Sequence, residues 1–365
     1  MTDDERYMQR ALVLAARGLY TTTPNPRVGC VLVRQGTIVA EGWHARAGGP
    51  HAEAAALAVA AGNASGTTAY VTLEPCSHHG RTPPCADALI AAGVARVVAA
   101  MADPNPLVAG RGVARLRAAG VRVDVGLLAD AARDLNPGFV SRMTHGMPWR
   151  RIKVAASLDG RTALRNGRSQ WITGADARRD GHHWRARACA VRTGIGTVRD
   201  DDPQLTVRDV ETPRQPLRIV VDSRLETPPG AKILAGGNVL IAAAIDDTGR
   251  RRALESRGAE VIVLPDPHGK VDLDALMREL GRRQLNEIHI EAGHKLNGSL
   301  LREGQVDEIL VYVAPALLGD AAQGMFHLPP IDDLAARRQF AFTSVERIGD
   351  DLRILARPVR AATGA

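Results

Sequence analysis

Three residues in the first quarter of the chain have side chains that bind transition metals. They are His51, Cys76 and Cys85. One imidazole and two thiols are soft ligands, and three protein ligands leave the fourth position of a tetrahedral zinc ion open to water. A structural zinc site has four ligands, often in two close pairs, so this set favours a catalytic zinc. The alternatives are a histidine that only begins a helix and cysteines that are inert and buried.

Glu53 follows the histidine by two residues. A carboxylate is not needed as a fourth ligand, and at this spacing it is placed to move protons between the water and a substrate. The pattern His-x-Glu, followed by Pro-Cys and a second Cys, is the signature of zinc-dependent nucleobase deaminases. The sequence therefore predicts hydrolytic deamination, with Glu53 as the group that moves the protons.

The elements that must position these residues follow from the pattern of apolar residues and turns. Thr2 and Glu5 form a capping box ahead of a first helix, and Gln35-Gly36 is a hairpin turn. We expect strands at 28–33, 38–42, 70–73, 96–100 and 121–125, and helices at 51–61, 86–92 and 113–119. The histidine and the second cysteine then stand at helix N-termini, where the positive potential favours thiolate over thiol.

The length of 365 residues suits two domains better than one core. A stretch rich in Pro and Gly, residues 136–148, predicts the boundary and gives domains of residues 1–146 and 147–365. The second domain has an α/β pattern with a tail, 339–357, that alternates like paired antiparallel strands. We expect strands at 152–156, 188–193, 217–222, 239–243, 261–264, 287–291 and 308–314, and helices at 176–187, 273–280 and 296–302.

Composition narrows the classes of partner. There is no run of about 18 apolar residues for a membrane span, and the acidic start lacks the features of a secretory signal. Four cysteines are too few for a disulfide framework, which fits a reducing cytoplasm. The net charge of +7 is compatible with nucleic acid, but aromatic residues make up only 3%, so platforms for stacking bases are scarce. We therefore expect an anionic small-molecule partner, no nucleic acid and no membrane, and leave a homo-oligomer open.

Three glycine-containing turns stand at the ends of expected strands in the second domain. They are residues 157–160, 193–197 and 291–298. The last runs from a strand into a helix, where exposed backbone N–H groups suit a phosphate. None is the dinucleotide-binding fingerprint with an acidic residue about twenty positions further on, so anion binding and ordinary loop glycines both stay open.

Taken together, these residues resemble the family of bifunctional riboflavin-biosynthesis deaminase–reductases. The eight residues between Cys76 and Cys85 depart from the short Pro-Cys-x-x-Cys of nucleoside and nucleic-acid deaminases, and the motif at 74–85 is the most specific piece of the resemblance. The other matching segments are 23–29, 155–161, 169–173 and 201–208. The resemblance implies an α/β protein in which an N-terminal cytidine-deaminase-like three-layer domain precedes a C-terminal dihydrofolate-reductase-like domain.

The activity implied by the resemblance is two consecutive steps of riboflavin synthesis in the cytoplasm. The first domain would remove the 2-amino group of 2,5-diamino-6-(5-phosphoribosylamino)pyrimidin-4(3H)-one with Zn²⁺. The second would reduce the ribosyl group of the resulting uracil to ribityl with NADPH. Two other readings remain: a nucleic-acid or nucleoside deaminase with an accessory domain, and a second half that only binds nucleotides for regulation.

The resemblance also assigns residues by position. His51, Cys76 and Cys85 would bind zinc, Glu53 would move the proton, and Asn25, His44 and His78 would line the deaminase pocket. Cofactor positions in the second domain are Lys153, Ala155, Trp171, Thr197, Asp201, Ser223, Gly293, His294, Lys295, Leu296, Asn297, Gly298 and Ser299. Substrate positions are Ser169, Arg185, Leu205, Arg208 and Glu291. Asp201 is also the hypothesised participant in the reduction, and His294 departs from the small residue or Pro expected there.

Overall fold

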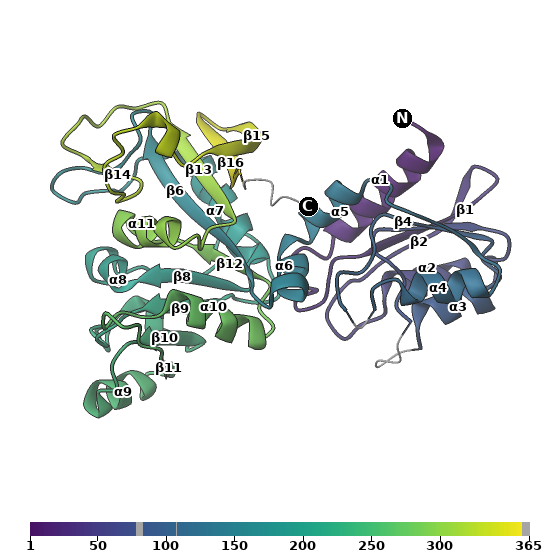
Figure 1. Cartoon of the computed structure of the whole chain (residues 1–365), viewed down its shortest axis with the longest axis horizontal. Coiled ribbons are helices and arrows are strands. Elements are labelled where there is room, and N and C mark those ends of the chain that lie inside the picture. Colours follow the sequence, from purple (N-terminus) through teal and green to yellow (C-terminus); the bar gives the residue numbers. More distant parts are fainter. Residues whose placement is uncertain (78–82, 107, 360–365) are drawn as a thin grey trace. The chain divides into compact units, whose positions relative to one another are not determined.

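The computed structural model describes residues 1–77, 83–106 and 108–359. The chain divides into two compact units. Unit 1 comprises Met1–Met147 with Gln284–Asn286, and unit 2 comprises Pro148–Arg283 with Glu287–Ala365 (Figure 1). Each unit is described by itself below. Among the described residues, no helix combines the length and the apolar character needed to cross a membrane.

Unit 1 is a mixed sheet with helices on both faces. Its helices are α1 (Asp3–Ala16), α2 (Ala52–Ala60), α3 (Cys85–Ala91), α4 (Arg111–Ala118), α5 (Ala129–Leu135) and α6 (Pro137–His145). Its strands are β1 (Gly29–Arg34), β2 (Thr37–Trp43), β3 (Thr68–Val71), β4 (Arg96–Ala99) and β5 (Arg122–Val125). The strand order is β2-β1-β3-β4-β5, in which β1 is antiparallel to both of its neighbours and β3, β4 and β5 are parallel.

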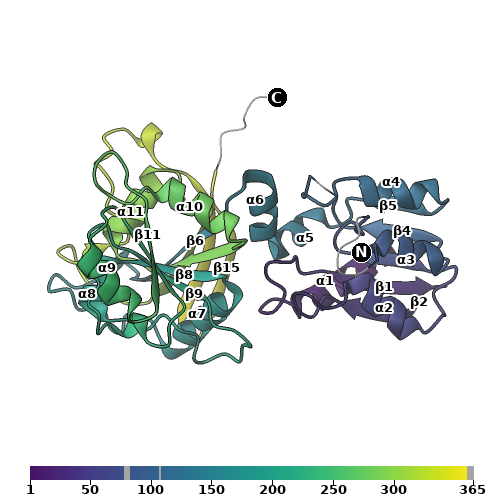
Figure 2. The same ribbon diagram turned by 90° about the horizontal axis from the view of Figure 1, so that it is seen from below.

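Two glycines let helices approach this sheet closely from opposite sides. A Cβ on Gly29 would lie 2.0 Å from the Ala11 carbonyl of α1, and a Cβ on Gly42 would lie 2.3 Å from the Ala56 nitrogen of α2. Helices α1 and α5 therefore form one outer layer, and α2, α3 and α4 form the other (Figure 1). Figure 2 shows α2, α3 and α4 side by side on their face. The three-layer arrangement predicted from the sequence is confirmed.

Two turn and capping motifs predicted in the sequence of unit 1 are present in the structure. The capping box forms at Thr2, and Gln35 and Gly36 both have positive φ, as the hairpin turn requires. Residues 136–148, from which the domain boundary was predicted, are mostly helix α6, and the two units divide directly after it, between Met147 and Pro148. The proline within α6 occupies the first helical turn, and its glycine, Gly146, ends the helix in the left-handed conformation. Helix α5 was not predicted.

Unit 2 is a larger α/β unit. Its helices are α7 (Ala175–Arg187), α8 (Ile195–Asp201), α9 (Thr248–Glu255), α10 (Leu273–Arg282) and α11 (His294–Arg302), with 3₁₀ turns at Lys232–Leu234 and Leu334–Ala336. Its strands are β6 (Trp149–Ser157), β7 (Arg161–Ala163), β8 (Ala190–Gly194), β9 (Leu217–Val221), β10 (Val239–Ala243), β11 (Ala259–Val263), β12 (Glu287–Ile290), β13 (Glu308–Ala314), β14 (Gln323–Gly324), β15 (Phe340–Ile348) and β16 (Asp351–Pro358). Helices α8 and α9, each of eight residues or fewer, were not predicted.

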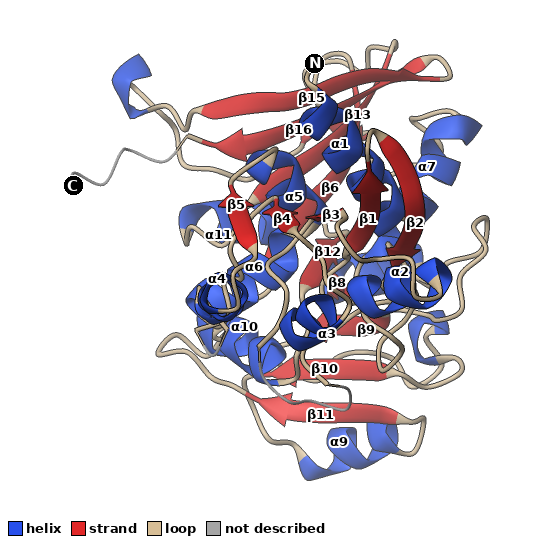
Figure 3. Ribbon diagram, turned by 90° about the vertical axis from the view of Figure 1, so that its right-hand side faces the viewer, coloured by secondary structure: helices blue, strands red, loops and turns tan. Residues whose placement is uncertain are grey.

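Nine of these strands form one sheet in the order β11-β10-β9-β8-β12-β6-β13-β16-β15 (Figure 3). Strands β7 and β14 pair in a small separate sheet. The strands from β11 to β13 are parallel, and β16 and β15 add two antiparallel strands at one edge. The antiparallel tail is therefore confirmed. Because parallel strands end at the same edge, the turns after β6, β8, β9 and β12 gather there, which is where open α/β sheets bind ligands.

The sheet face covered by α7 contains buried charges, which a purely apolar core would lack. Arg151 is 2% exposed and donates to Glu308 and to Glu287, and its guanidinium lies 4.5 Å from the centre of the Trp184 ring on α7. Buried ions of both signs are compensated by such pairing. Sequence periodicity alone does not reveal this layer, because its members alternate with apolar residues along the strands.

Candidate functional site

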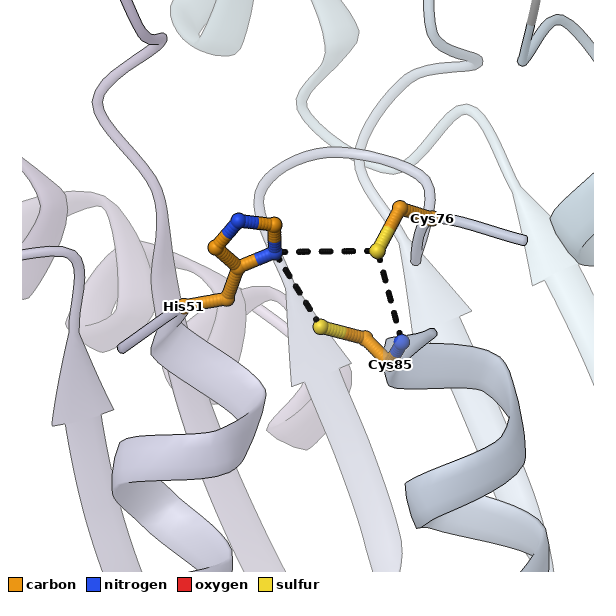
Figure 4. Close-up of side chains that lie close together, drawn as sticks. All are labelled: His51, Cys76 and Cys85. Atoms are coloured by element: carbon orange, nitrogen blue, oxygen red, sulfur yellow. Dashed lines mark hydrogen bonds between the residues drawn. The ribbon is translucent and has the colours of Figure 1, made fainter. Parts of the chain in front are cut away.

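The three metal-binding side chains of unit 1 converge, although 34 residues separate the first from the last. His51 caps the N-terminus of α2, Cys85 is the first residue of α3, and Cys76 lies in the loop after β3. Figure 4 shows the three side chains pointing toward one another. Their ligand atoms all lie within 4.8 Å of one another, with His51 Nδ1 3.3 Å from Cys85 Sγ and 3.6 Å from Cys76 Sγ.

These distances fit a zinc ion. Metal–nitrogen and metal–sulfur bonds of the usual lengths, at a tetrahedral angle, place a ligand nitrogen about 3.5 Å from a ligand sulfur. Contacts with Cys85 and His51 lower the pKa of Cys76 to about 4, whereas the same contact with Cys76 raises the pKa of Cys85. A bound divalent cation would favour thiolate at both cysteines.

Glu53 is the second residue of α2, two positions after the cap residue His51, and is only 4% exposed. Burial raises the pKa of its carboxyl group to about 7. A carboxyl group with a pKa near neutrality can both accept and release a proton at physiological pH. The structure thus places the predicted proton carrier beside the predicted metal ligands.

Two of the three predicted pocket residues adjoin the metal cluster. Asn25 Nδ2 donates to His44 Nε2 (3.1 Å), and His44 Nδ1 donates to the carbonyl oxygen of Pro50 (2.8 Å). The carbonyl only accepts, so the His44 ring is neutral with its proton on Nδ1, and burial lowers its pKa. The ring lies edge-on to that of His51, with centroids 5.6 Å apart. The third residue, His78, lies outside the described residues.

In unit 2, an ion pair at the carboxyl edge of the sheet joins two predicted substrate residues. Arg185 of α7 donates through Nε and Nη2 to the two carboxylate oxygens of Glu291, the latter bond at 2.9 Å. Both side chains are about 15% exposed. Burial alone would raise the pKa of Glu291, but Arg185 holds it well below its usual range. Arg185 Nη1 also donates to the carbonyl of Thr206 (3.1 Å).

Lys153 belongs to the same group. Ile152 of β6 is paired with Ile290 of β12, so the residues that follow them, Lys153 and Glu291, are level. Burial lowers the pKa of Lys153, and the negative charge of Glu291 opposes that shift. A lysine with a depressed pKa beside a carboxylate is a candidate for proton transfer or for holding a polar substrate.

Arg208 approaches this group through a shared neighbour. Its Nη1 donates to Thr206 Oγ1 (3.3 Å), and Thr206 is the residue whose carbonyl accepts from Arg185. Leu205, also predicted to contact substrate, is instead 4% exposed and packs in the hydrophobic core. Ser169 is half-buried, in the segment ahead of Trp171.

The two glycine-containing segments predicted to bind cofactor lie against each other. A Cβ on Gly293, the cap of α11, would lie 3.9 Å from Thr197 Oγ1, and a Cβ on Gly194 would lie 3.2 Å from Leu296 Cδ2. Because β8 and β12 are neighbours, the N-terminus of α11 and its backbone N–H groups stand at the shared edge. Gly298 has another role, since a Cβ there would lie 2.1 Å from the His327 carbonyl.

The remaining cofactor positions are more dispersed. Ala155 is on β6 opposite Tyr312, and Trp171 is largely exposed with the Arg178 guanidinium 4.7 Å from its ring centre. Ser223 Oγ accepts the Val271 N–H (3.2 Å). His294, Lys295, Asn297 and Ser299 all lie within α11.

Asp201 is the last residue of α8 and is exposed, while partial burial of its carboxyl group and the neighbouring charge of Asp200 raise its pKa.

His289 is a residue that the sequence reasoning missed. It is fully buried, with Nε2 3.5 Å from Glu291 Oε1. The available signal was its position two residues before Glu291, which places both side chains on one face of β12.

Fold and sites together define a class: a zinc-dependent deaminase joined to an α/β reductase. Comparisons with known proteins agree. Residues 1–101 match the family model of the cytidine and deoxycytidylate deaminase zinc-binding region, and residues 148–354 match that of the RibD C-terminal domain.

Relatives match over nearly the whole chain. The chain is 51% identical over 362 residues to the riboflavin biosynthesis protein RibD of Escherichia coli, covering 96% of this chain and 98% of that protein. Among solved structures, Acinetobacter baumannii RibD has a TM-score of 0.90 and 44% identity, covering 98% and 99% of the two chains. A diaminohydroxyphosphoribosylaminopyrimidine deaminase/5-amino-6-(5-phosphoribosylamino)uracil reductase from Thermotoga maritima has a TM-score of 0.85 and 32% identity, with the same coverage.

The chain therefore belongs to the RibD family of bifunctional riboflavin-biosynthesis deaminase–reductases. It is an enzyme with a zinc-dependent deaminase activity and an NADPH-dependent reductase activity. Its second unit has the dihydrofolate-reductase-like fold that the sequence resemblance implied.

Proposed function

We propose that His51, Cys76 and Cys85 hold the zinc ion and that Glu53 moves the protons of the deamination. The substrate is 2,5-diamino-6-(5-phosphoribosylamino)pyrimidin-4(3H)-one, and the products are ammonia and 5-amino-6-(5-phosphoribosylamino)uracil. The observation that carries this assignment is the set of three ligand atoms within 4.8 Å of one another, with a buried carboxyl group in the adjacent helical turn. Zinc, when bound, lowers the pKa of a water molecule so that it can attack C2.

The residues of the chain then have separate tasks. Glu53 accepts one proton of the attacking water and delivers it to the ring nitrogen, and it then carries the second proton, from the hydroxyl group formed at C2, to the departing amine. Asn25 and His44 orient the substrate, since their side chains are locked together beside His51. Burial of Glu53 keeps bulk water from competing for its proton.

In the reductase reaction, we assign the carboxyl edge of the unit 2 sheet to NADPH and the adjoining cations to the substrate. Opening of the ribosylamine ring gives an imine at C1′, which accepts hydride from NADPH and one proton to become the ribitylamine. Arg208 is placed to bind the 5′-phosphate, because its guanidinium is exposed and neighbours the Arg185–Glu291 pair through Thr206. Asp201, with its raised pKa, is the candidate proton donor.

The two reactions divide between the two halves of the chain, with residues 1–146 as deaminase and residues 147–365 as reductase. The matched family models, at residues 1–101 and 148–354, support this division. We further propose that the enzyme works in the cytoplasm on phosphorylated pyrimidines, without nucleic-acid or membrane partners.

Removing the metal tests these assignments. A chelator should abolish ammonia release from the diaminopyrimidine and leave NADPH oxidation with supplied uracil substrate unchanged, and added Zn²⁺ should restore the first activity. Loss of both activities on chelation would contradict separate sites. Ammonia release that persists in metal-free protein would contradict the zinc assignment.

A further inference from the structure

Glu74 is a buried carboxylate that has no part in the chemistry proposed above. It stands two residues before Cys76 and is 3% exposed. Its Oε2 accepts the backbone N–H groups of Asp103 (3.1 Å) and Gly110 (2.9 Å), and its Oε1 accepts that of Val113 (3.1 Å). Both carboxylate oxygens are therefore committed to backbone donors of one segment, far along the chain.

Gly110 and Val113 lie at the start of helix α4, and Asp103 lies in the loop ahead of it. The helix begins after Gly110, which has no side chain to cap it and adopts a left-handed conformation with φ +76°. The N–H of the third helical residue, here Val113, is the one that a Ser or Asp cap normally satisfies. Glu74 supplies this cap from the end of another strand, and its negative charge lies at the positive end of the helix.

The loop that carries the cysteine is also pressed against α4. A Cβ on Gly112 would lie 1.9 Å from the carbonyl oxygen of Pro75, so only glycine allows this approach. On the other side, the Cys76 carbonyl accepts the Ala86 N–H (3.1 Å), and Cys76 Sγ accepts the Cys85 N–H (3.3 Å). The cysteine is thus held between the N-termini of α3 and α4.

We propose that Glu74 is a positioning residue for the zinc site: by capping α4 it fixes the loop that presents Cys76 to the metal. This inference rests on the proposed function, in which Cys76 is a zinc ligand. A carboxylate can accept all three N–H groups, whereas the amide of Gln has one acceptor oxygen and an NH₂ that would face backbone donors. Glu74→Gln therefore leaves buried N–H groups unpaired and releases the loop.

The experiment measures zinc affinity in the full chain by competition with a chelator. It also records the absorption spectrum of the Co²⁺-substituted protein, which reports thiolate coordination geometry. Glu74→Gln should weaken zinc binding about 10- to 100-fold, the usual effect of removing a group that orients a metal ligand. The Co²⁺ bands should shift or weaken, while reductase activity stays at the parent level.

A matched control separates positioning from general loss of stability. Glu41→Gln removes a carboxylate of the same unit that pairs with Arg10 through two bonds of 2.7 Å, away from the metal cluster. It should leave zinc affinity and the Co²⁺ spectrum unchanged. Gly112→Ala pushes the loop from α4 and keeps the carboxylate of Glu74, whose Oε1 would lie 3.2 Å from the added Cβ, and it should reproduce the zinc defect of Glu74→Gln.

Parental zinc affinity and an unchanged Co²⁺ spectrum in Glu74→Gln would overturn the proposal. So would an equal loss of affinity in Glu41→Gln, or collapse of unit 1 in both Glu74→Gln and Gly112→Ala. If only Glu74→Gln fails to fold, Gly112→Ala tests the proposal instead. Weakened zinc binding in that variant supports it, and parental zinc binding overturns it. Failure of the underlying zinc assignment would look different, because Cys76→Ser would then keep its zinc.

Discussion

The metal cluster of unit 1 and the charged group of unit 2 are built in opposite ways. The first takes its ligands from residues 51–85, and the residue types themselves specify the chemistry. The second joins Arg185 to Glu291, which are 106 residues apart, and adds Lys153 from a third element. None of those three residue types implies a reaction by itself. The metal cluster can thus be recognised from residue types in the sequence. The residues of the charged group, in contrast, come together only through the order of the strands.

The largest effect is expected when one of the two sulfur ligands of the proposed zinc site is removed. Cys76→Ser replaces a thiolate by a hydroxyl, which binds zinc poorly, so the metal content should fall from about one ion per chain to background. Ammonia release should fall below detection, and reduction of supplied uracil substrate should persist. Cys189→Ser, which alters a buried cysteine of unit 2, is the control and should keep its zinc. Undiminished zinc content in Cys76→Ser would contradict the ligand assignment.

The second largest effect is expected at the proton carrier. Glu53→Gln preserves shape and removes the base, so deaminase kcat should fall at least ~100-fold, the scale of general acid–base catalysis. Zinc content, measured by elemental analysis of the purified protein, should equal that of the parent. Activity within a few-fold of the parent would exclude this role for Glu53.

Asp201 tests whether the reductase site has an equally definite proton donor. Asp201→Asn should lower kcat with NADPH by about 10- to 100-fold, toward the lower end of acid–base effects, and leave deamination intact. Asp332→Asn alters another exposed carboxylate of unit 2 and serves as the control. If only the KM for NADPH rises, Asp201 positions the cofactor and the proton comes from another group.

Arg208 should show a smaller effect, confined to binding. Loss of a charge-assisted contact of about 1.5 kcal/mol predicts a rise of about 10-fold in the KM for the uracil substrate in Arg208→Ala, with kcat nearly unchanged. Arg257→Ala removes another exposed arginine of unit 2 and should change neither constant. A fall in kcat without a change in KM would argue against phosphate binding by Arg208.

The smallest expected effect is on the free energy of unfolding of unit 2 at acid pH. The pKa of Glu291 is lowered in the folded protein, so its ion pair stabilises the fold at pH values above the ordinary glutamate pKa. That contribution is lost as the pH falls through the ordinary range and toward the depressed pKa. Denaturant unfolding of unit 2 between pH 6 and about pH 3 should therefore show a shallower loss of stability in Glu291→Gln than in the parent. Equal slopes would contradict the inferred pairing.

The sequence was sufficient to predict those parts of the molecule in which the functional residues also mark the beginning of a helix. The helices at His51 and Cys85 begin where they were predicted, and the three side chains proposed to bind zinc lie within 4.8 Å of one another. Helix α6 was missed because Pro137 and Gly146 resemble the residues of a linker, although they are also the residues that begin and end a helix.

The features that were not predicted depend on contacts between distant residues. The spacing of apolar residues along the sequence does not encode such contacts. Nothing in the sequence around Glu74 indicates that it caps a helix 37 to 39 residues away. Leu205 matches a substrate position by resemblance, yet its side chain is buried in the hydrophobic core of unit 2. His289 precedes Glu291 by two residues, but that spacing alone does not show that the imidazole is buried 3.5 Å from the carboxylate.

The central claim is that one chain performs two ordered reactions at two independent sites. The most direct measurement incubates the protein with 2,5-diamino-6-(5-phosphoribosylamino)pyrimidin-4(3H)-one, with and without NADPH, and follows ammonia, NADPH and the pyrimidine products together. Without NADPH, we expect one ammonia per substrate and accumulation of the ribosylaminouracil. With NADPH, ammonia release should be unchanged and the ribitylaminouracil should form with one NADPH oxidised per product. Oxidation of NADPH that precedes ammonia release, or that fails when the ribosylaminouracil is supplied directly, would contradict the account.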